Sequence, residues 1–222
     1  MATGEELVFF EGNIHRLIIS LTLCVLSFAS FLHAAPVYVE KAMVSGNTKW
    51  TSSFDFEIKS NEVLVNIDIS LLPSKGVSGL KLKDKLAFWK EAINQKWNDK
   101  FVVSINGETK PIRFNVRFTH HKPHHRVIVH PGNWGPNQHN WYLNMPAEVA
   151  AHELGHMLGA YDEYKGGALS PESKNVDFSS IMGGNPKKGQ AEVRHLVVLE
   201  KAFMEKIGVD KVRISKVLRS FK

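Results

Sequence analysis

Cysteine is almost missing from this chain of 222 residues, because the only one, Cys24, lies within an uncharged apolar segment near the start. The residues beyond that segment can therefore form no disulfide bond and offer no thiolate to a metal ion. This composition argues against a small domain stabilised by disulfides. Combined with an export signal, it favours a bacterial exported protein.

The chain also lacks internal repeats, and its Lys and Arg residues are scattered rather than gathered into one run. The net charge of +6 therefore indicates solubility, and no nucleic-acid partner is predicted. An acidic partner or an anionic cell surface is the alternative interpretation. Hydrophobic residues make up 43% of the chain and charged residues 23%, which is typical of a globular protein with one hydrophobic core.

The apolar segment comprises residues 17–32, LIISLTLCVLSFASFL, and small residues follow it at Ala34 and Ala35. These features predict a secretory signal peptide over residues 1–35, cleaved near Ala34 or Ala35. Cleavage removes three acidic residues and one basic residue, so the net charge rises from +6 to +8. The protein would then be secreted or periplasmic, with no stable membrane partner. The alternative is a membrane anchor formed by residues 17–32, which fall just short of a full span.

The remaining residues, 36–222, are predicted to form a single α+β domain with a mixed twisted sheet. Apolar residues at helical spacing predict three helices: residues 80–98, a metal-binding helix at 146–159, and a C-terminal helix at 190–207. Alternating patterns predict strands at residues 37–44, 54–58, 62–70 and 126–130. Asn106 and Gly107 predict the turn of a hairpin between two further strands.

The stretch AAHELGHMLGAYDEY, residues 150–164, contains the pattern of a zinc site. His152 and His156 are four residues apart, so a helix presents both ring nitrogens to one ion. Glu153 comes one residue after the first histidine and can reach a water molecule on the metal instead of the metal itself. Because zinc held by three protein ligands keeps its fourth position for that water, Glu153 can act as the general base.

The third ligand is predicted to be Asp162, six residues after His156. Gly159 can adopt a left-handed turn that ends the helix, and residues 160–162 can then return toward the ion. A carboxylate oxygen binds zinc at about 2.0–2.2 Å, so aspartate is chemically adequate. Glu163 is the alternative ligand, because its longer side chain compensates for its displacement by one position.

With these residues the sequence resembles a known family. HELGHMLGAYD matches the metzincin zinc-peptidase pattern through Gly159 and has Asp162 where that pattern has a third histidine. The aspartate variant is similar to snapalysin-type secreted proteases, and LGAYDEY is similar to a segment of immune inhibitor A-like peptidases. SSIMGG, residues 179–184, resembles the Met-turn that lies beneath the metal in metzincins. The resemblance covers residues 152–184.

The resemblance implies a metzincin-like catalytic domain that uses Zn²⁺ and hydrolyses a protein or peptide substrate. Its residue roles are zinc ligation by His152, His156 and Asp162, general base catalysis by Glu153, and a hydrophobic floor formed by Met182. The strand at residues 126–130 would be the upper edge strand of the cleft and would bind an extended substrate by strand addition. No tyrosine follows Met182, although some metzincins use one there to stabilise the oxyanion. Another donor must then serve, or water and zinc suffice.

Several other residues have two interpretations. Six histidines between residues 120 and 139 suggest a second metal site, but they show no ligand spacing on a helix, so a polar loop beside the cleft is favoured. Tyr161 and Tyr164 are either cleft residues or packing residues of the turn. His195 is expected at the surface or at the edge of the core.

The sequence therefore predicts an exported zinc-dependent endopeptidase. The alternative function is a catalytically weak, zinc-containing module that binds proteins or cell-wall polymers. Glu153 argues against this alternative, because a binding module needs no base at that position.

Overall fold

The computed structural model describes residues 35–173, 175–208 and 211–217, which belong to one compact unit. The predicted signal segment at residues 17–32 lies outside these residues. Within the described ranges, none of the helices is both long and apolar enough to cross a membrane.

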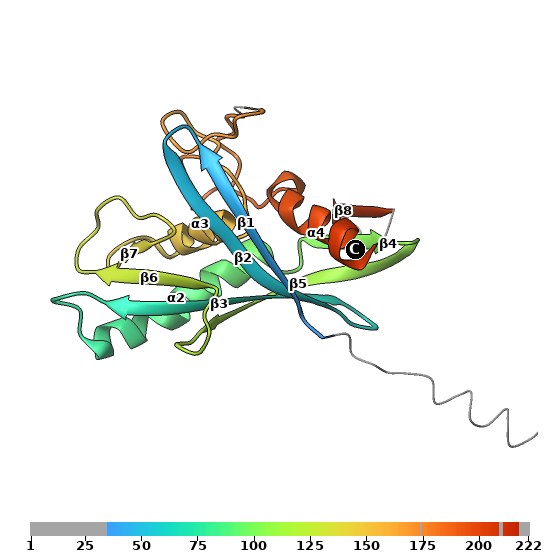
Figure 1. The fold of residues 1–222 in the computed structure, drawn as a ribbon. Helices are drawn as coiled ribbons and strands as arrows, with labels where there is room; N and C mark the ends of the chain where they lie inside the picture. Colours follow the sequence, from blue (N-terminus) through green and yellow to red (C-terminus); the bar gives the residue numbers. More distant parts are fainter. Residues whose placement is uncertain (1–34, 174, 209–210, 218–222) are drawn as a thin grey trace, which may run out of the picture. The chain divides into compact units, whose positions relative to one another are not determined.

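The described strands form one mixed sheet of eight members (Figure 1). They are β1 (Val37–Ser45), β2 (Thr48–Ile58), β3 (Val63–Pro73), β4 (Phe101–Ile105), β5 (Glu108–Phe118), β6 (His125–His130), β7 (Asn140–Tyr142) and β8 (Val212–Lys216). The long strand β3 lies at the centre. It is antiparallel to β2. Its first part runs parallel to β5, and its last part runs parallel to β6. The predicted mixed sheet is therefore confirmed.

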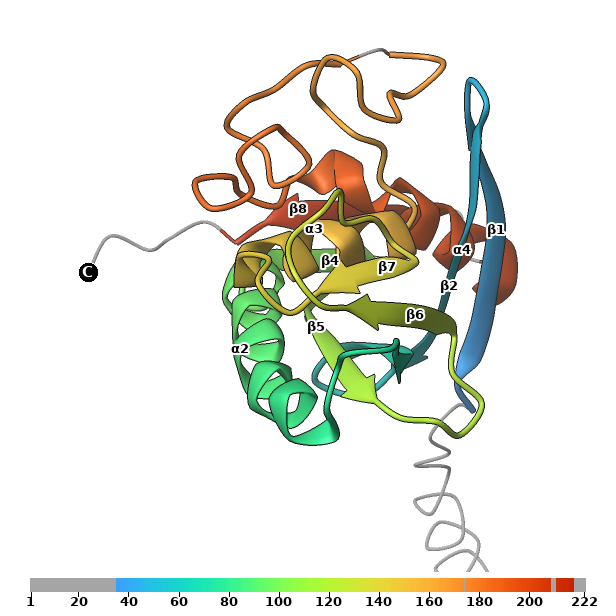
Figure 2. The same cartoon turned by 90° about the vertical axis from the view of Figure 1, so that its left-hand side faces the viewer.

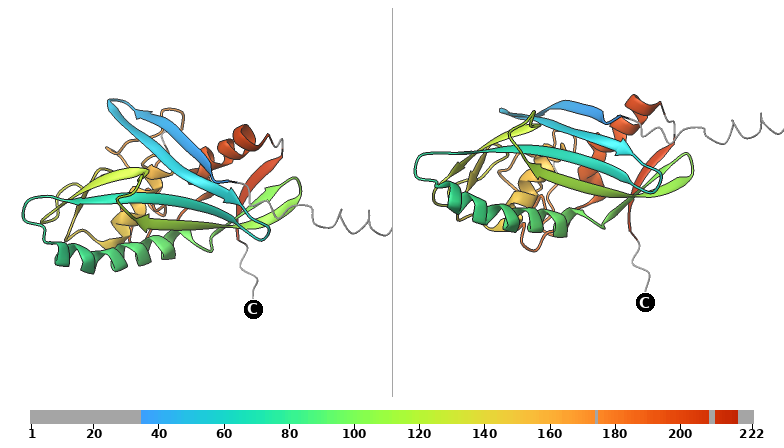
Figure 3. Two further views of the ribbon diagram at one scale, coloured as in Figure 1. Left: turned by 60° about the horizontal axis from the view of Figure 1, so that its bottom comes forward. Right: turned by 90° about the horizontal axis from the view of Figure 1, so that it is seen from below.

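Three α-helices occur in the described residues: α2 (Gly79–Trp97), α3 (Ala147–Met157) and α4 (Val197–Ile207). In both views of Figure 3, α2 runs along the sheet, and Figure 2 shows α3 beside it. The helices pack on one face of the sheet. Trp97 of α2 contacts Phe114 of β5, and Phe203 of α4 contacts Phe56 of β2. This arrangement confirms the α+β class, with the hydrophobic core between the helices and the sheet.

Tryptophan side chains hold α3 from two sides. Trp97 of α2 donates its indole N–H to the carbonyl oxygen of Ala151 at 2.9 Å, and Trp50 of β2 donates to that of His156 at 3.0 Å. Both indoles are buried, so these hydrogen bonds satisfy polar groups that would otherwise be costly to bury. The helix that carries the histidine pair is therefore anchored to α2 and to the sheet.

Local patterns predicted most elements to within a few residues. Asn106 and Gly107 both have positive φ angles, of 51° and 92°, as a tight hairpin turn between β4 and β5 requires. The last helix begins later than expected, because residues 193–196 form the 3₁₀ turn η2 (Val193–Leu196) before α4. Two strands were not predicted. β7 has only three residues, and β8 follows α4 and pairs with β4.

The prediction that residues 126–130 form the edge strand is wrong. β6 pairs with β3 on one side and with β7 on the other. The chain after β6 folds back on it, and the backbone N–H groups of Ile128 and Leu143 donate to the carbonyl oxygens of His139 and His130. β7 consequently takes the edge position. This short strand follows a loop, and its sequence shows no strand pattern.

Candidate metal centre

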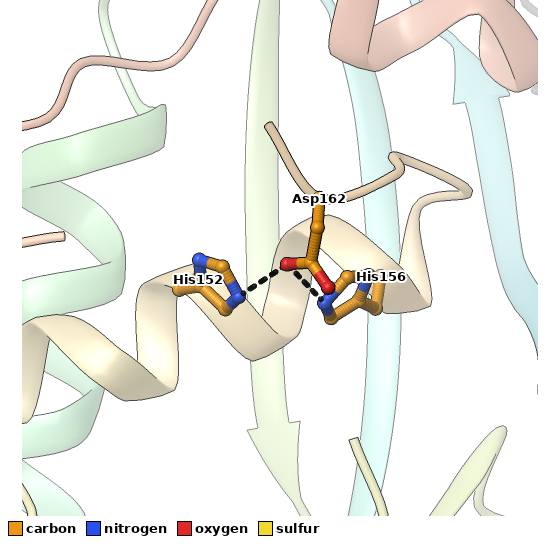
Figure 4. Close-up of side chains that lie close together, drawn as sticks. All are labelled: His152, His156 and Asp162. Atoms are coloured by element: carbon orange, nitrogen blue, oxygen red, sulfur yellow. Dashed lines mark ion pairs between the residues drawn. The ribbon is translucent and has the colours of Figure 1, made fainter. Parts of the chain in front are cut away.

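The two histidines of α3 lie one turn apart and are both buried (Figure 4). The Nδ1 atom of His152 is 2.8 Å from the carbonyl oxygen of Ile181, and that of His156 is 3.0 Å from the carbonyl oxygen of Ala160. Because a carbonyl oxygen only accepts hydrogen bonds, each Nδ1 carries the proton of the neutral imidazole. Each Nε2 atom therefore has a free lone pair, as a metal ligand requires.

Asp162 completes the group. One of its carboxylate oxygens, Oδ1, lies 3.1 Å from Nε2 of His152 and 3.3 Å from Nε2 of His156. The other oxygen, Oδ2, accepts a hydrogen bond from the backbone N–H of Ala168 at 2.6 Å, which fixes the orientation of the carboxylate. One ligand atom from each of the three residues lies within 4.8 Å of the others, so the group could hold a metal ion.

The turn that brings Asp162 back to the helix depends on Gly159. This residue has a φ angle of +93°, in the left-handed region, as the sequence predicted. A Cβ atom at this position would also clash with the side chain of Val198 on α4. Glycine is thus required both for the backbone conformation and for the close approach of α4.

The buried polar atoms of the site fit a bound cation. Asp162 Oδ1 and Glu153 Oε2 are two of the buried side-chain atoms in the described residues that have no hydrogen-bond partner. An unpaired buried carboxylate oxygen is costly. Here Asp162 Oδ1 meets two Nε2 atoms that are themselves acceptors, so three acceptors converge on one point. A cation at that point would satisfy all three.

The carboxylates and histidines also shift one another's pKa. Burial lowers the pKa of His152, but the neighbouring carboxylates of Asp162 and Glu153 outweigh it and raise that pKa overall. Burial raises the pKa of Asp162, but His152 and His156, in their protonated forms, outweigh it and hold that pKa well below its usual range. Metal binding must displace any proton from His152. Metal affinity should therefore weaken as the pH falls through the raised pKa of His152.

Glu153 lies beside the ligand group and is almost completely buried. Glu153 does not belong to the group of three residues whose ligand atoms converge. Burial raises its pKa, against the opposing effect of His152 and His156. A carboxylate with a raised pKa is better matched to proton transfer near neutral pH than an ordinary glutamate is.

Met182 lies directly beneath α3. Its side chain is fully buried, and a Cβ atom at Gly155, between the two histidines on the helix, would clash with its sulfur atom. The backbone N–H of Met182 donates to the Ser180 hydroxyl at 2.9 Å, which tightens the turn. The same turn supplies the Ile181 carbonyl oxygen that orients His152.

We expect Met182→Ala to lower the free energy of unfolding by about 2–5 kcal/mol, because it leaves a cavity beneath α3. The measurement is urea-induced unfolding of the variant with and without added Zn²⁺. Met204→Ala is the matched control, since Met204 on α4 is 39% exposed and its loss should change stability by less than about 0.5 kcal/mol. Equal stability of the two variants would contradict the packing role of Met182.

Glu163, the alternative ligand, points to other partners. Its carboxylate accepts hydrogen bonds from Arg194 at 2.5 and 2.8 Å and lies 3.4 Å from Nε2 of His195. His195 is buried, with 2% of its surface exposed, so of the two expected positions, the surface or the edge of the core, the surface is wrong. Its Nδ1 atom accepts the backbone N–H of Glu192, which leaves the proton on Nε2.

The two tyrosines of the motif have different surroundings. The ring of Tyr161 packs edge-on against Trp50, at a centroid distance of 5.3 Å. The ring of Tyr164 lies 6.3 Å from that of His152. Burial, followed by the charges of Asp162 and Glu153, raises the pKa of Tyr164 to about 12. Its hydroxyl is therefore protonated at neutral pH.

The histidines between residues 120 and 139 belong to separate contacts. His124 lies 3.3 Å from Asp55, His125 contacts the carbonyl oxygen of Ser53, and His130 contacts Asn140. Burial lowers the pKa of His125 to about 4. Within the described ranges, none of these histidines belongs to a group of three or more residues that could hold a metal ion.

Sequence reasoning missed three residues that support the site: Trp50, Ser180 and Arg194. Trp50 is more than a hundred positions from the carbonyl oxygen that it binds, and no local pattern connects the two.

Comparison of the chain with known protein families, with curated protein sequences and with solved structures finds no match.

Proposed function

We propose that this chain is an exported zinc-dependent endopeptidase with a metzincin-like fold. The observation that carries the proposal is the convergence of two free imidazole nitrogens and one unpaired carboxylate oxygen, with a buried carboxylate beside them. Two histidines and one carboxylate form a ligand set that suits Zn²⁺ in catalytic sites with an open fourth position. Export follows from the signal-like segment at residues 17–32.

The chemistry divides between the ion and the chain. A bound Zn²⁺ would polarise the scissile carbonyl and lower the pKa of a water molecule to about 7. Glu153 would take the proton from the attacking water and deliver it to the leaving amine. The backbone carbonyl oxygens of Ile181 and Ala160 keep His152 and His156 in the tautomer that the ion needs.

The proposed substrate is a protein or peptide, as the resemblance of the motif implies. β7 holds the edge position that the sequence assigned to residues 126–130. Its backbone groups are largely occupied, because Asn140 exchanges two hydrogen bonds with Asn137 and the carbonyl oxygen of Tyr142 accepts the N–H of Met145. Addition of an extended peptide to this edge would therefore require these local hydrogen bonds to open.

The experiment that tests the function is hydrolysis of casein or gelatin by the purified protein, with and without a chelator. We expect cleavage that is lost with the chelator and restored by Zn²⁺. Zinc binding without hydrolysis would favour the binding module that recognises proteins or cell-wall polymers.

We expect Tyr164→Phe to lower turnover by about 100-fold without reducing metal content. The ring of Tyr164 lies 6.3 Å from that of His152 and its hydroxyl is protonated, so we propose that this hydroxyl donates a hydrogen bond to the developing negative charge on the carbonyl oxygen. One such donor contributes this order of magnitude. The measurement is turnover with a peptide substrate, together with the zinc content of each sample. Tyr161→Phe is the control, because that ring packs against Trp50. Similar losses in both variants would contradict the donor role.

A further inference from the structure

We propose that Glu163 and Arg194 are positioning residues, which hold the turn at residues 177–182 so that it aims the metal ligands. The proposal rests on the metal site of the proposed function, but it does not require that the bound metal catalyse hydrolysis. Neither residue belongs to the ligand group.

The turn at residues 177–182 contacts the ligand residues directly. Its Ile181 carbonyl oxygen orients His152 through Nδ1, at 2.8 Å. Its Met182 carbonyl oxygen accepts the backbone N–H of Glu163 at 2.8 Å, one residue after Asp162. Any displacement of this turn would therefore move two of the three ligands, one on α3 and one on the loop.

Glu163 attaches to this turn through its backbone and its side chain. Besides donating to Met182, its backbone accepts the N–H of Asp177 at 2.9 Å. Its carboxylate is buried and receives both hydrogen bonds from the guanidinium of Arg194. Two parallel hydrogen bonds between these planar groups fix their mutual orientation as well as their distance.

Arg194 connects Glu163 to the start of the turn. The same guanidinium donates a third hydrogen bond, to the carboxylate of Asp177 at 2.6 Å. The next residue, His195, lies 3.2 Å from the Ser180 hydroxyl that accepts the Met182 N–H. Two consecutive residues of η2 thus hold both ends of the turn.

The test is the zinc affinity of Arg194→Met, measured by competition with a chromogenic chelator. We expect affinity to fall by about 10- to 100-fold, as is typical when a residue that supports metal ligands is replaced. Glu163→Gln should give a loss in the same range. In the Co²⁺-loaded variants, the visible absorption bands should shift, because the ligands are less well aimed.

Arg117→Met is the matched control. Arg117 of β5 also donates two hydrogen bonds to one carboxylate, that of Asp68 on the neighbouring strand β3, at 2.6 and 2.7 Å. The side chains of Arg117 and Arg194 are both partly exposed, 52% and 39%. Loss of either pair should lower stability, but only Arg194→Met should weaken zinc binding.

Equal zinc affinity in Arg194→Met and the unaltered protein would overturn the positioning role. A similar loss in Arg117→Met would also overturn it, because the effect would then follow from stability alone. Zinc binding without peptide hydrolysis in the unaltered protein would contradict the endopeptidase function and leave the positioning role intact. Failure of the unaltered protein to bind zinc would overturn both.

Discussion

Glu153→Gln should bind Zn²⁺ as the unaltered protein does and lose about 100- to 10,000-fold in peptide turnover. The amide has nearly the shape of the carboxylate but cannot accept a proton, and this range is typical for the loss of a general base. Metal binding should persist, because Glu153 is outside the group of three residues that could hold the ion. The measurements are zinc content after dialysis and turnover with a peptide substrate.

The unfolding free energy helps to identify the role of Glu153. Its Oε2 atom is buried without a hydrogen-bond partner, and burial raises its pKa, so the ionised side chain adds little to stability. The variant should therefore be at least as stable as the unaltered protein while it loses activity. Glu148→Gln is the control, since Glu148 is a partly exposed acidic residue in the first turn of the same helix. Near-normal turnover in Glu153→Gln would exclude the proposed mechanism.

Local sequence patterns were sufficient for the part of the site that α3 carries. Helical spacing placed His152 and His156 on one face, and the left-handed conformation of Gly159 was expected from its position at the helix end. These features depend on backbone geometry within about ten residues, which periodicity and glycine placement report well. The position of Met182 depended instead on a resemblance over a short segment.

The remaining features of the site arise from contacts between distant parts of the chain. Arg194 binds Glu163 across 31 positions, and Trp50 binds the carbonyl oxygen of His156 across 106 positions. From the sequence alone, Arg194 would be interpreted as a solvated charge and Trp50 as a core residue. Neither local pattern indicates which distant residue the side chain contacts.

The short strand β7 also had no periodic signal, so the sequence analysis placed the edge of the sheet at β6, one strand too early.

The largest expected effect is the loss of zinc from Asp162→Ala. Of the three described residues that could hold the ion, Asp162 alone lies outside α3, and its removal leaves two imidazoles from one helix. Ligands that bind the folded state alone stabilise it by about 2.7 kcal/mol at a concentration 100-fold above Kd. The unaltered protein should gain this much in unfolding free energy when Zn²⁺ is added, whereas Asp162→Ala should gain none at the same concentration. Peptide turnover should disappear together with the bound metal.

Two further variants separate ligation from the structural role of this carboxylate, which also accepts the backbone N–H of Ala168. Asp162→His should bind Zn²⁺ again, because an imidazole nitrogen replaces the carboxylate oxygen as ligand. Glu172→Ala removes an exposed carboxylate from the same loop, so its zinc affinity should match that of the unaltered protein. Full zinc retention in Asp162→Ala would exclude Asp162 as a ligand. The third ligand would then have to be Glu163, released from Arg194, or a histidine from residues 120–139.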